Sequence, residues 1–356
     1  MPHRTAAGCA AMSPPKIRVL IVDDSAIVRR ALSEIVNAHP DLEVAGTASD
    51  PFVARDKILA LHPDVITLDI EMPRMDGLTF LKKLMRYHPL PVVVISSLGQ
   101  ASSRSAIEAL QSGAVEVVAK PGGPYSVSEL RAELAGKIRA AAGARLRPAE
   151  TVHPPEPAPI PRVNLNVPSI IAIGASTGGV EALRRVLVEL PAEMPPIVVV
   201  QHIPAGFSAE FARRLDGMCR VRVKEAADGD ALQPGWVHIA PGNFHLRVGG
   251  PAGSYRAEVA DGPKVQFQRP SADVLFESVA AHAGASAMGV ILTGMGADGA
   301  AGMLAMKKAG AHNIAQDEAS CVVFGMPQAA IRLGAVDQIL PLDRIASTLG
   351  AWHRPR

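Results

Sequence analysis

Short apolar runs alternate with stretches of helical periodicity along most of the chain. Within the first 143 residues this alternation occurs five times. The predicted strands cover 16–22, 44–48, 64–68, 91–95 and 116–119, and the predicted helices cover 26–38, 51–61, 78–86, 104–111 and 128–141. A repeated strand–helix order builds a parallel sheet with helices on both faces. We therefore predict a (βα)5, flavodoxin-like first domain.

A second alternation begins at residue 170. Predicted strands at 170–173, 196–201, 287–292 and 313–316 are interleaved with helices at 180–190, 208–216 and 300–309, and two more helices close the chain. Between them lie four short strand candidates, 221–225, 236–239, 244–248 and 255–259, and a helix over 271–283 with Ser271 as its N-cap. This order predicts a second α/β domain with a parallel central sheet and a small antiparallel insertion.

The two domains are separated by a segment dense in proline. It lacks apolar periodicity, which predicts a semi-rigid linker with polyproline II character. Residues 1–15 lack the apolar core of a signal peptide, and we expect them to form a disordered leader. The predicted division is a leader at 1–15, a first domain at 16–143, a linker at 144–168 and a second domain at 169–352.

Composition narrows the class of protein. Apolar residues make up 48%, charged residues 20%, and the net charge is +2, which argues against nucleic acid or an anionic membrane as the main partner. Cys9, Cys219 and Cys321 form no C-x-x-C pair, which favours a reducing compartment. No apolar run reaches the length of a membrane span. We expect a cytoplasmic monomer without membrane insertion.

Polar residues follow the predicted strands of the first domain. Carboxyl ends of parallel strands meet at one edge of a sheet, where α/β proteins build their sites. Three carboxylates at one edge repel unless a cation lies among them, and their oxygens suit Mg²⁺, while a lysine suits an anion. Each residue alone is also an ordinary way to end a strand; their joint placement favours a site. The residues are Asp23, Asp24, Asp69, Ser96 and Lys120.

The second domain opens with Gly174-Ala175-Ser176-Thr177-Gly178 after an apolar run, a formal match to G-x-S-x-G. In such a strand–turn–helix the serine hydroxyl is exposed, and the amides of the helix N-terminus can stabilise an oxyanion. A glycine-rich turn before a helix also suits phosphate binding, or a purely structural role. The stretch lacks both the P-loop ending and the full G-x-G-x-x-G spacing, which argues against nucleotide binding.

Ser176, His202 and Asp298 follow three different predicted strands. They have the chemical types of a nucleophile, a base and an orienting acid, and we expect them on one sheet edge. Taken singly, His202 is better explained by packing and Asp298 by an Asx turn, and their joint placement favours a triad. No Cys/His cluster has zinc spacing. The order Ser, His, Asp differs from that of α/β-hydrolases, so that fold is not implied.

The first domain resembles the receiver domain of bacterial two-component response regulators. The segments that carry the resemblance are VLIVDDSAIVRR, ITLDIEMPRMDGL, PVVVISS and VVAKP. The resemblance implies that Asp69 accepts a phosphoryl group from a histidine kinase, and that Ser96 and Lys120 contact its oxygens. It also assigns Mg²⁺ coordination to Asp23, Asp24, Asp69 and the backbone carbonyl of Glu71.

The second domain resembles the CheB-type chemotaxis receptor methylesterases and glutamine deamidases, through IAIGASTGG, VVQHIP, IAPGNFHL, RPSADVLFESVA and ILTGMGADGA. The resemblance implies a triad of Ser176, His202 and Asp298. It makes the backbone N–H of Met295 an oxyanion donor and Thr177 a site-shaping residue. It further implies cofactor-free hydrolysis of glutamate methyl esters and glutamines on methyl-accepting chemotaxis receptors, activated by receiver phosphorylation.

Two other classes remain open from the sequence. The second domain could be a binding module that assembles on phosphorylation, or an enzyme of another sensory pathway. The order of switch domain, linker and enzyme also suggests that the unphosphorylated first domain packs over the Ser176 edge and limits access.

Overall fold

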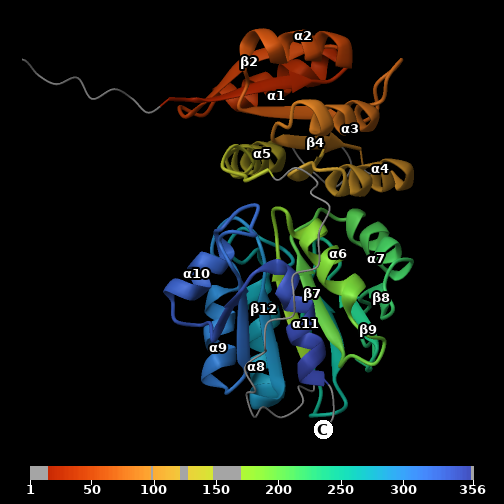
Figure 1. Ribbon diagram of the computed structural model, residues 1–356, viewed down its shortest axis with the longest axis vertical. Helices are drawn as coiled ribbons and strands as arrows, with labels where there is room; N and C mark the ends of the chain where they lie inside the picture. Colours follow the sequence, from red (N-terminus) through yellow and green to blue (C-terminus); the bar gives the residue numbers. More distant parts are fainter. Residues whose placement is uncertain (1–14, 98, 121–126, 147–169, 354–356) are drawn as a thin grey trace, which may run out of the picture.

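The computed structural model describes residues 15–97, 99–120, 127–146 and 170–353, which form two domains stacked along the long axis of the molecule (Figure 1). The predicted leader and linker lie almost entirely outside the described residues. Only residue 15 and residues 144–146 of them are described.

The first domain contains a five-stranded parallel sheet in the order β2-β1-β3-β4-β5. Its strands are β1 (Ile17–Val22), β2 (Leu42–Ala48), β3 (Val65–Asp69), β4 (Val92–Ser96) and β5 (Glu116–Ala119). Its helices are α1 (Ala26–Asn37), α2 (Pro51–Leu61), α3 (Gly77–Tyr87), α4 (Gln100–Gln111) and α5 (Val127–Ala142). The predicted (βα)5 fold is confirmed.

Local sequence explains where these helices begin. Three of them start after a residue whose side-chain oxygen accepts a backbone N–H of the first turn: Ser25 for α1, Asp50 for α2 and Asp76 for α3. All five residues of β3 and of β4 are buried, as expected for strands with helices on both faces.

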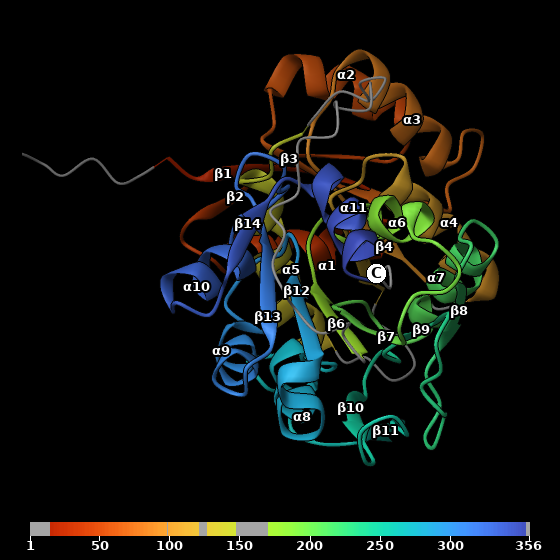
Figure 2. The ribbon, with the colours of Figure 1, turned by 60° about the horizontal axis from the view of Figure 1, so that its bottom comes forward.

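The second domain is built on a seven-stranded sheet in the order β14-β13-β12-β6-β7-β9-β8, in which every neighbouring pair is parallel (Figure 2). Its strands are β6 (Ile170–Ala175), β7 (Ile197–Gln201), β8 (Arg222–Glu225), β9 (Trp236–Ile239), β12 (Ala287–Ile291), β13 (His312–Gln316) and β14 (Gln338–Leu340). The predicted parallel centre is confirmed.

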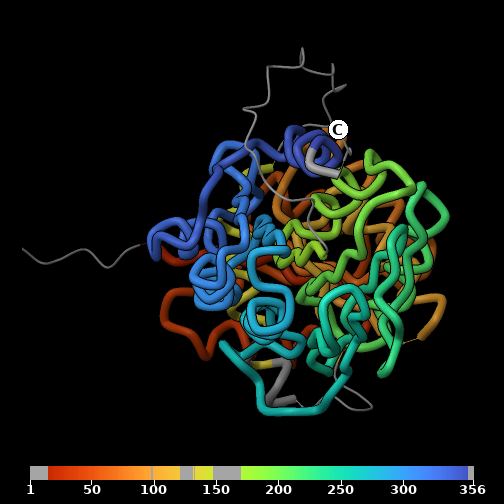
Figure 3. Tube along the Cα trace, turned by 90° about the horizontal axis from the view of Figure 1, so that it is seen from below, coloured from red at the N-terminus to blue at the C-terminus, as the bar shows by residue number. Residues whose placement is uncertain are grey.

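Helices cover both faces of this sheet. On one side lie α6 (Gly179–Glu189), α7 (Phe207–Asp216) and α11 (Leu342–His353), and on the other lie α8 (Ala272–Ala283), α9 (Ala300–Lys308) and α10 (Met326–Arg332), as Figure 2 shows. A single 3-10 turn, η1 (Gly284–Ser286), joins α8 to β12. Seen from below, the second domain covers much of the first (Figure 3).

The antiparallel insertion is smaller than predicted. Among the named strands of the described residues, only β10 (His245–Gly249) and β11 (Arg256–Ala260) pair antiparallel, whereas β8 and β9 extend the main sheet in parallel. Strands β8 and β9 are each four residues long, and in the edge strand β8 Lys224 and Glu225 are only partly buried. The apolar and polar pattern of two such short strands is the same as that of an antiparallel hairpin. Strand β14, three residues long, was not predicted.

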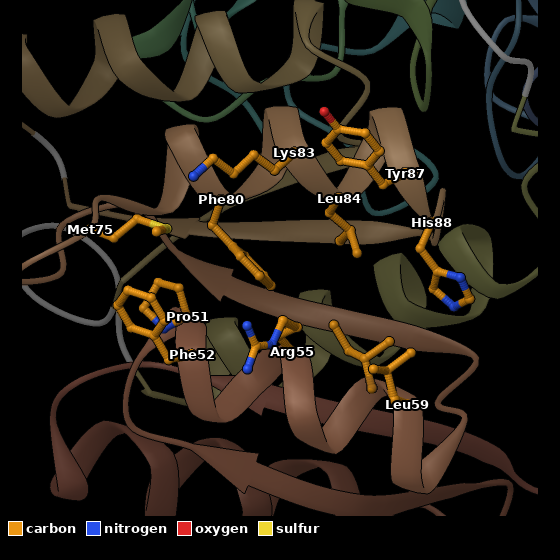
Figure 4. Close-up of a pocket in the computed structure, with 11 residues that line it drawn as sticks. Pro51, Phe52, Arg55, Leu59, Met75, Phe80, Lys83, Leu84, Tyr87 and His88 are labelled. Atoms are coloured by element: carbon orange, nitrogen blue, oxygen red, sulfur yellow. The ribbon is translucent and has the colours of Figure 1, made fainter.

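The first domain also contains an apolar hollow of about 290 Å³ between α2 and α3 (Figure 4). It is lined by residues such as Phe52, Phe80 and Tyr87, none of which is among the predicted site residues. Among the described residues, no helix is both long and apolar enough to cross a membrane.

Candidate active site

The register of the central strands brings Ser176 and His202 together. Strands β12, β6 and β7 are neighbours, and Ala175 at the end of β6 pairs with Gln201 at the end of β7. Ser176 and His202 each follow that pair by one residue. The backbone N–H of His202 donates to the Ala175 carbonyl (3.1 Å), and that of Ser176 donates to the Thr293 carbonyl (3.0 Å).

Two glycines make the turn around Ser176 possible. Gly178, the N-cap of α6, has a φ of 76°, and a Cβ there would lie 2.6 Å from Cβ of Val322. A Cβ on Gly294 would lie 2.7 Å from Cβ of Ser176. At both positions the neighbouring atoms lie too close for a residue with a Cβ atom, so only glycine fits. This close packing holds Ser176 at the strand-to-helix turn.

His202 is fixed by Asp298. Its Nε2 lies 2.7 Å from Oδ2 of Asp298, and both side chains are buried. A neutral imidazole that donates through Nε2 keeps a lone pair on Nδ1, and this atom is buried with no hydrogen-bond partner among the described residues. The unoccupied Nδ1 is the atom that can accept the proton of Ser176.

Asp298 lies at the N-terminus of α8. Its Oδ2 accepts the backbone N–H of Ala272 (2.7 Å), and its Oδ1 accepts the Ser271 hydroxyl (2.6 Å) and the N–H of Asp273 (3.2 Å). Burial alone would raise the pKa of Asp298, but the hydrogen bonds that it accepts from His202, Ser271 and Ala272 hold this pKa below its usual value. The carboxylate therefore stays ionised.

The turn after β12 carries Met295, the residue predicted to be the oxyanion donor. Met295 lies between Gly294 and Gly296, is 42% exposed, and its backbone N–H donates to no other backbone group of the described chain. Thr177 follows Ser176 and is buried; its carbonyl accepts the Thr293 hydroxyl (2.9 Å). The structure thus places a free N–H and a fixed backbone next to the nucleophile.

The carboxylates of the first domain also meet at one sheet edge. Ligand oxygens of Asp23, Asp24 and Asp69 all lie within 4.8 Å of one another. Lys120 Nζ donates to Oδ2 of Asp69 (2.7 Å) and lies 3.3 Å from Oδ2 of Asp23, yet that Asp23 oxygen is buried without a hydrogen bond. Burial raises the pKa of Asp69 despite the neighbouring Lys120. Three hard oxygen donors, one of them lacking a hydrogen bond, fit a small divalent cation.

One predicted residue of this site, Ser96, points elsewhere in this conformation. The Ser96 hydroxyl donates to the carbonyl of Ser102 in α4 (3.3 Å) instead of to Asp69. The Glu71 side chain accepts the Ser102 hydroxyl, while its backbone N–H donates to Asp69 Oδ1 (3.1 Å). Both contacts tie the carboxylate edge to the start of α4.

Comparison with known proteins identifies the family. The family model for CheB methylesterase matches residues 171–349, and that for the response regulator receiver domain matches residues 19–134. The chain is 54% identical over 337 residues to "Protein-glutamate methylesterase/protein-glutamine glutaminase 2" of Syntrophus aciditrophicus, covering 94% of this chain and 98% of the relative. The chain belongs to the CheB methylesterase family. Its first domain is a response regulator receiver domain.

Other relatives agree with this assignment. A "Protein-glutamate methylesterase/protein-glutamine glutaminase" of Ralstonia nicotianae is 52% identical, with 93% of this chain and 94% of the relative covered. The crystal structure of the Thermotoga maritima CheB methylesterase catalytic domain matches with a TM-score of 0.51 and 40% identity, covering 52% of this chain and 98% of that one.

In this CheB-family protein the receiver lies against the edge of the second sheet that carries Ser176 (Figure 1). Helix α4 packs against α6 and α7, and the Val322 side chain packs against the apolar core of the receiver. The hydroxyl of Thr177, the residue after Ser176, donates to the Glu116 carboxylate of β5. The receiver therefore contacts the active-site turn directly.

Glu116 is held from the receiver side by Lys137 of α5. The Lys137 ammonium lies 3.4 Å from Oε2 of Glu116 and 2.8 Å from Glu133. Burial alone would lower the pKa of Lys137, but these two carboxylates raise it above its usual value. The sequence held no signal for this role except a glutamate at the start of an apolar strand.

Sequence reasoning also missed how Asp298 is supported. Ser271 was predicted as the N-cap of α8, and its hydroxyl does accept Val274 N–H (3.4 Å), but the same hydroxyl donates to Asp298. The Ser271 N–H in turn donates to Nδ1 of His245 (3.3 Å). The segment RPSADVLFESVA, which carried the family resemblance, was the available signal.

A second buried carboxyl lies beside the triad. Asp273 accepts the backbone N–H of Gly302 (2.7 Å), and burial, helped by the charges of Asp298 and Glu277, raises the pKa of Asp273 to about 6. Because this value exceeds the ordinary 3.8, the folded protein binds more protons than the unfolded chain between about pH 4 and 6. Stability from this group is thus lost as the pH rises through that range.

The variant Asp273→Asn keeps the oxygen that accepts from Gly302 and removes the titration. We expect it to be more stable than the wild type by about 1–3 kcal/mol at pH 8 and equally stable near pH 4. Urea unfolding of the full chain at pH 4, 6 and 8 measures the difference. Glu193→Gln, a change of the same kind at an exposed glutamate that is not among the groups shifting the Asp273 pKa, is the control. If the free energies of unfolding of the wild type and Asp273→Asn differed by the same amount at all three pH values, the raised pKa of Asp273 would be contradicted.

Proposed function

We propose that this protein hydrolyses glutamate γ-methyl esters and deamidates glutamine side chains on methyl-accepting chemotaxis receptors, under the control of its receiver. The observation that carries the proposal is the buried, unpartnered Nδ1 of His202, on an imidazole oriented by Asp298 and on the same sheet edge as Ser176. The relatives' names supply the substrate class.

Hydrolysis proceeds through an acyl-enzyme. Ser176 Oγ attacks the side-chain carbonyl carbon while its proton moves to Nδ1 of His202, and Asp298 stabilises the imidazolium. The Met295 N–H stabilises the oxyanion. His202 then protonates the departing methoxide, which leaves as methanol. Water, deprotonated by His202, attacks the acyl-serine and releases the glutamate carboxylate together with a regenerated Ser176 hydroxyl.

Glutamine deamidation follows the same route with ammonia as the leaving group. The amide is the harder substrate, since its nitrogen must be protonated by His202 before it can leave. Mass spectrometry of receptor peptides tests both activities: the methyl groups should be lost from esterified glutamates, and the glutamines should be converted to glutamates. Receptor peptides left unchanged by an enzyme that still cleaves small esters would overturn the proposed substrate.

Control begins at the receiver. Asp69 accepts a phosphoryl group from a histidine kinase, and Asp23, Asp24, Asp69 and the Glu71 carbonyl would hold Mg²⁺, which neutralises phosphoryl charge. Lys120, already 2.7 Å from Asp69, adds a second positive charge. Turning the Ser96 hydroxyl to the new phosphoryl oxygens would break its bond to Ser102 at the start of α4.

Helix α4 links that switch to the active site, because it also packs on α6 and α7. In the docked arrangement the receiver covers the Ser176 edge, and only 8% of Ser176 and of His202 is exposed. Movement of α4 would weaken the docked interface and the Thr177–Glu116 contact, opening the site to a protein substrate.

The Glu116→Gln variant tests this contact. The change keeps the size of the side chain but removes the charge that accepts the Thr177 hydroxyl and pairs with Lys137. We expect basal esterase activity, without phosphodonor, to rise about 3- to 10-fold, because the amide oxygen of glutamine replaces a charge-assisted hydrogen bond with a weaker neutral one. Initial rates of methanol release from receptor membranes measure it.

The pair Arg145–Glu318 supplies a matched control for Glu116→Gln. It also joins the two parts of the chain, but its side chains are 58% and 56% exposed, so Arg145→Ala should change the basal rate by less than about 2-fold. Equal effects of the two variants would contradict a specific role for Glu116.

A further inference from the structure

A two-residue hairpin just before Ser271 in the chain holds a phenylalanine out in solvent. Val265 and Gln268 exchange two backbone hydrogen bonds, of 3.0 and 2.8 Å, across the turn residues Gln266 and Phe267. The Phe267 side chain is 93% exposed, the highest value among the exposed large apolar residues of the described chain.

The backbone of this turn is costly for its sequence. Gln266 and Phe267 have φ angles of 50° and 64°, a conformation that favours Asn-Gly and costs other residues about 1–2 kcal/mol each. Burial of Phe267 does not repay that cost, because the ring contacts almost nothing within the protein. Strain combined with exposure of a large apolar group points to a contact outside the chain.

Arg269, which directly follows the hairpin, ties it to neighbouring loops, and the chain beyond reaches Asp298. Arg269 donates to Oδ1 of Asn243 through Nε (3.2 Å) and NH2 (2.8 Å), and through NH1 to Asp261. Two residues further along the chain, Ser271 donates to Asp298 (2.6 Å). The position of Phe267 is therefore set relative to the catalytic acid.

A second exposed aromatic side chain lies on the loop that Arg269 clamps. Phe244 is 43% exposed and follows Asn243. That loop packs against the segment after His202, since a Cβ on Gly242 would lie 2.6 Å from the backbone nitrogen of Ala205. Exposed Met295 belongs to the turn on the opposite side of Ser176. Large apolar side chains thus flank the nucleophile instead of filling the core.

We propose that Phe267 is a docking residue for the protein substrate, contacting apolar side chains on the receptor helix that presents the esterified glutamate. A projecting ring fits between side chains three and four residues apart on a helix, and aromatic anchors of this kind dominate protein interfaces. Phe267 acts on substrate affinity and leaves the chemistry unchanged. This inference rests on the proposed function, because it names the surface that recognises that substrate.

The test uses the full chain with phosphodonor and two substrates, methylated receptor membranes and p-nitrophenyl acetate. The double variant Gln266→Asn/Phe267→Gly removes the ring and installs the preferred turn sequence, so folding is preserved. We expect kcat/KM on receptor membranes to fall about 10- to 30-fold, mainly through KM, as for loss of an interface anchor. Hydrolysis of p-nitrophenyl acetate should be unchanged, and Phe267→Tyr should retain receptor activity.

Phe52→Ser is the matched control, since Phe52 is also exposed, at 47%, but lies on α2 of the receiver. It should leave both activities unchanged. Undiminished receptor demethylation in the double variant would overturn the inference, and so would a parallel loss of p-nitrophenyl acetate hydrolysis. A wild type that cleaves p-nitrophenyl acetate but releases no methanol from receptors would overturn the proposed substrate, and this inference with it.

Discussion

Replacing Ser176 with alanine is expected to lower the rate of methanol release by about 10⁴-fold or more. Without the nucleophile, only substrate binding and the oxyanion contacts remain to accelerate the reaction. Because the side chain is small and Ser176 is held through its backbone, by the Thr293 carbonyl and the Gly178–Gly179 turn, the variant should fold normally. Initial-rate assays on receptor membranes, with circular dichroism as a folding check, measure the effect.

Labelling by a serine-directed fluorophosphonate should be lost in the same variant. Ser278→Ala is the control, because its hydroxyl donates to the Leu275 carbonyl within α8 and has no part in the triad. Methanol release that survives Ser176→Ala would remove Ser176 from the mechanism and restore the structural interpretation of the glycine-rich turn.

Asp298→Asn is expected to lower kcat by roughly 10³- to 10⁴-fold with little change in KM. Oδ1 of Asp298 accepts both the Ser271 hydroxyl and the Asp273 N–H, whereas Oδ2, which faces His202, accepts only the Ala272 N–H besides, so the amide oxygen is favoured at the Oδ1 position. The asparagine would therefore turn its NH2 towards His202, whose Nε2 would have to accept. The proton would then reside on Nδ1, which could no longer take the serine proton.

The pH profile separates this tautomer effect from simple loss of structure. Asp298→Asn should remain folded and bind receptor membranes as the wild type does, yet stay slow at every pH at which the wild type is active. Asp337→Asn, which alters a carboxylate paired with Lys307 away from the site, should behave as the wild type. An Asp298→Asn enzyme of near-normal kcat would show that His202 needs no orienting acid.

Much of the architecture followed from local pattern. Apolar runs that end in polar residues indicated where the strands end. Because the carboxyl ends of parallel strands meet at one edge of a sheet, Ser176, His202 and Asp298 were expected on one edge, where the structure has them. The prediction succeeded because β6, β7 and β12 are long, apolar and central. It was wrong for β8 and β9, whose short, mixed sequences do not show which partner they pair with.

The contacts that tune the site could not be derived in this way. Ser271 reaches Asp298 across 27 residues, and Thr177 reaches Glu116 across 61 residues and between domains. Neither pair leaves a periodic signal, because each depends on how a helix or a whole domain packs. The exposed Phe267 was equally invisible, since an apolar residue in sequence gives no sign that it remains in solvent.

The most direct test of the account is methanol release from methylated receptor membranes by the wild type and Asp69→Asn, each with and without a small phosphodonor and Mg²⁺. We expect the phosphodonor to stimulate methanol release by the wild type but not by Asp69→Asn, and we expect Ser176→Ala to be inactive under all conditions. Serine-dependent release that the phosphodonor leaves unchanged in the wild type would contradict control of Ser176 by the receiver.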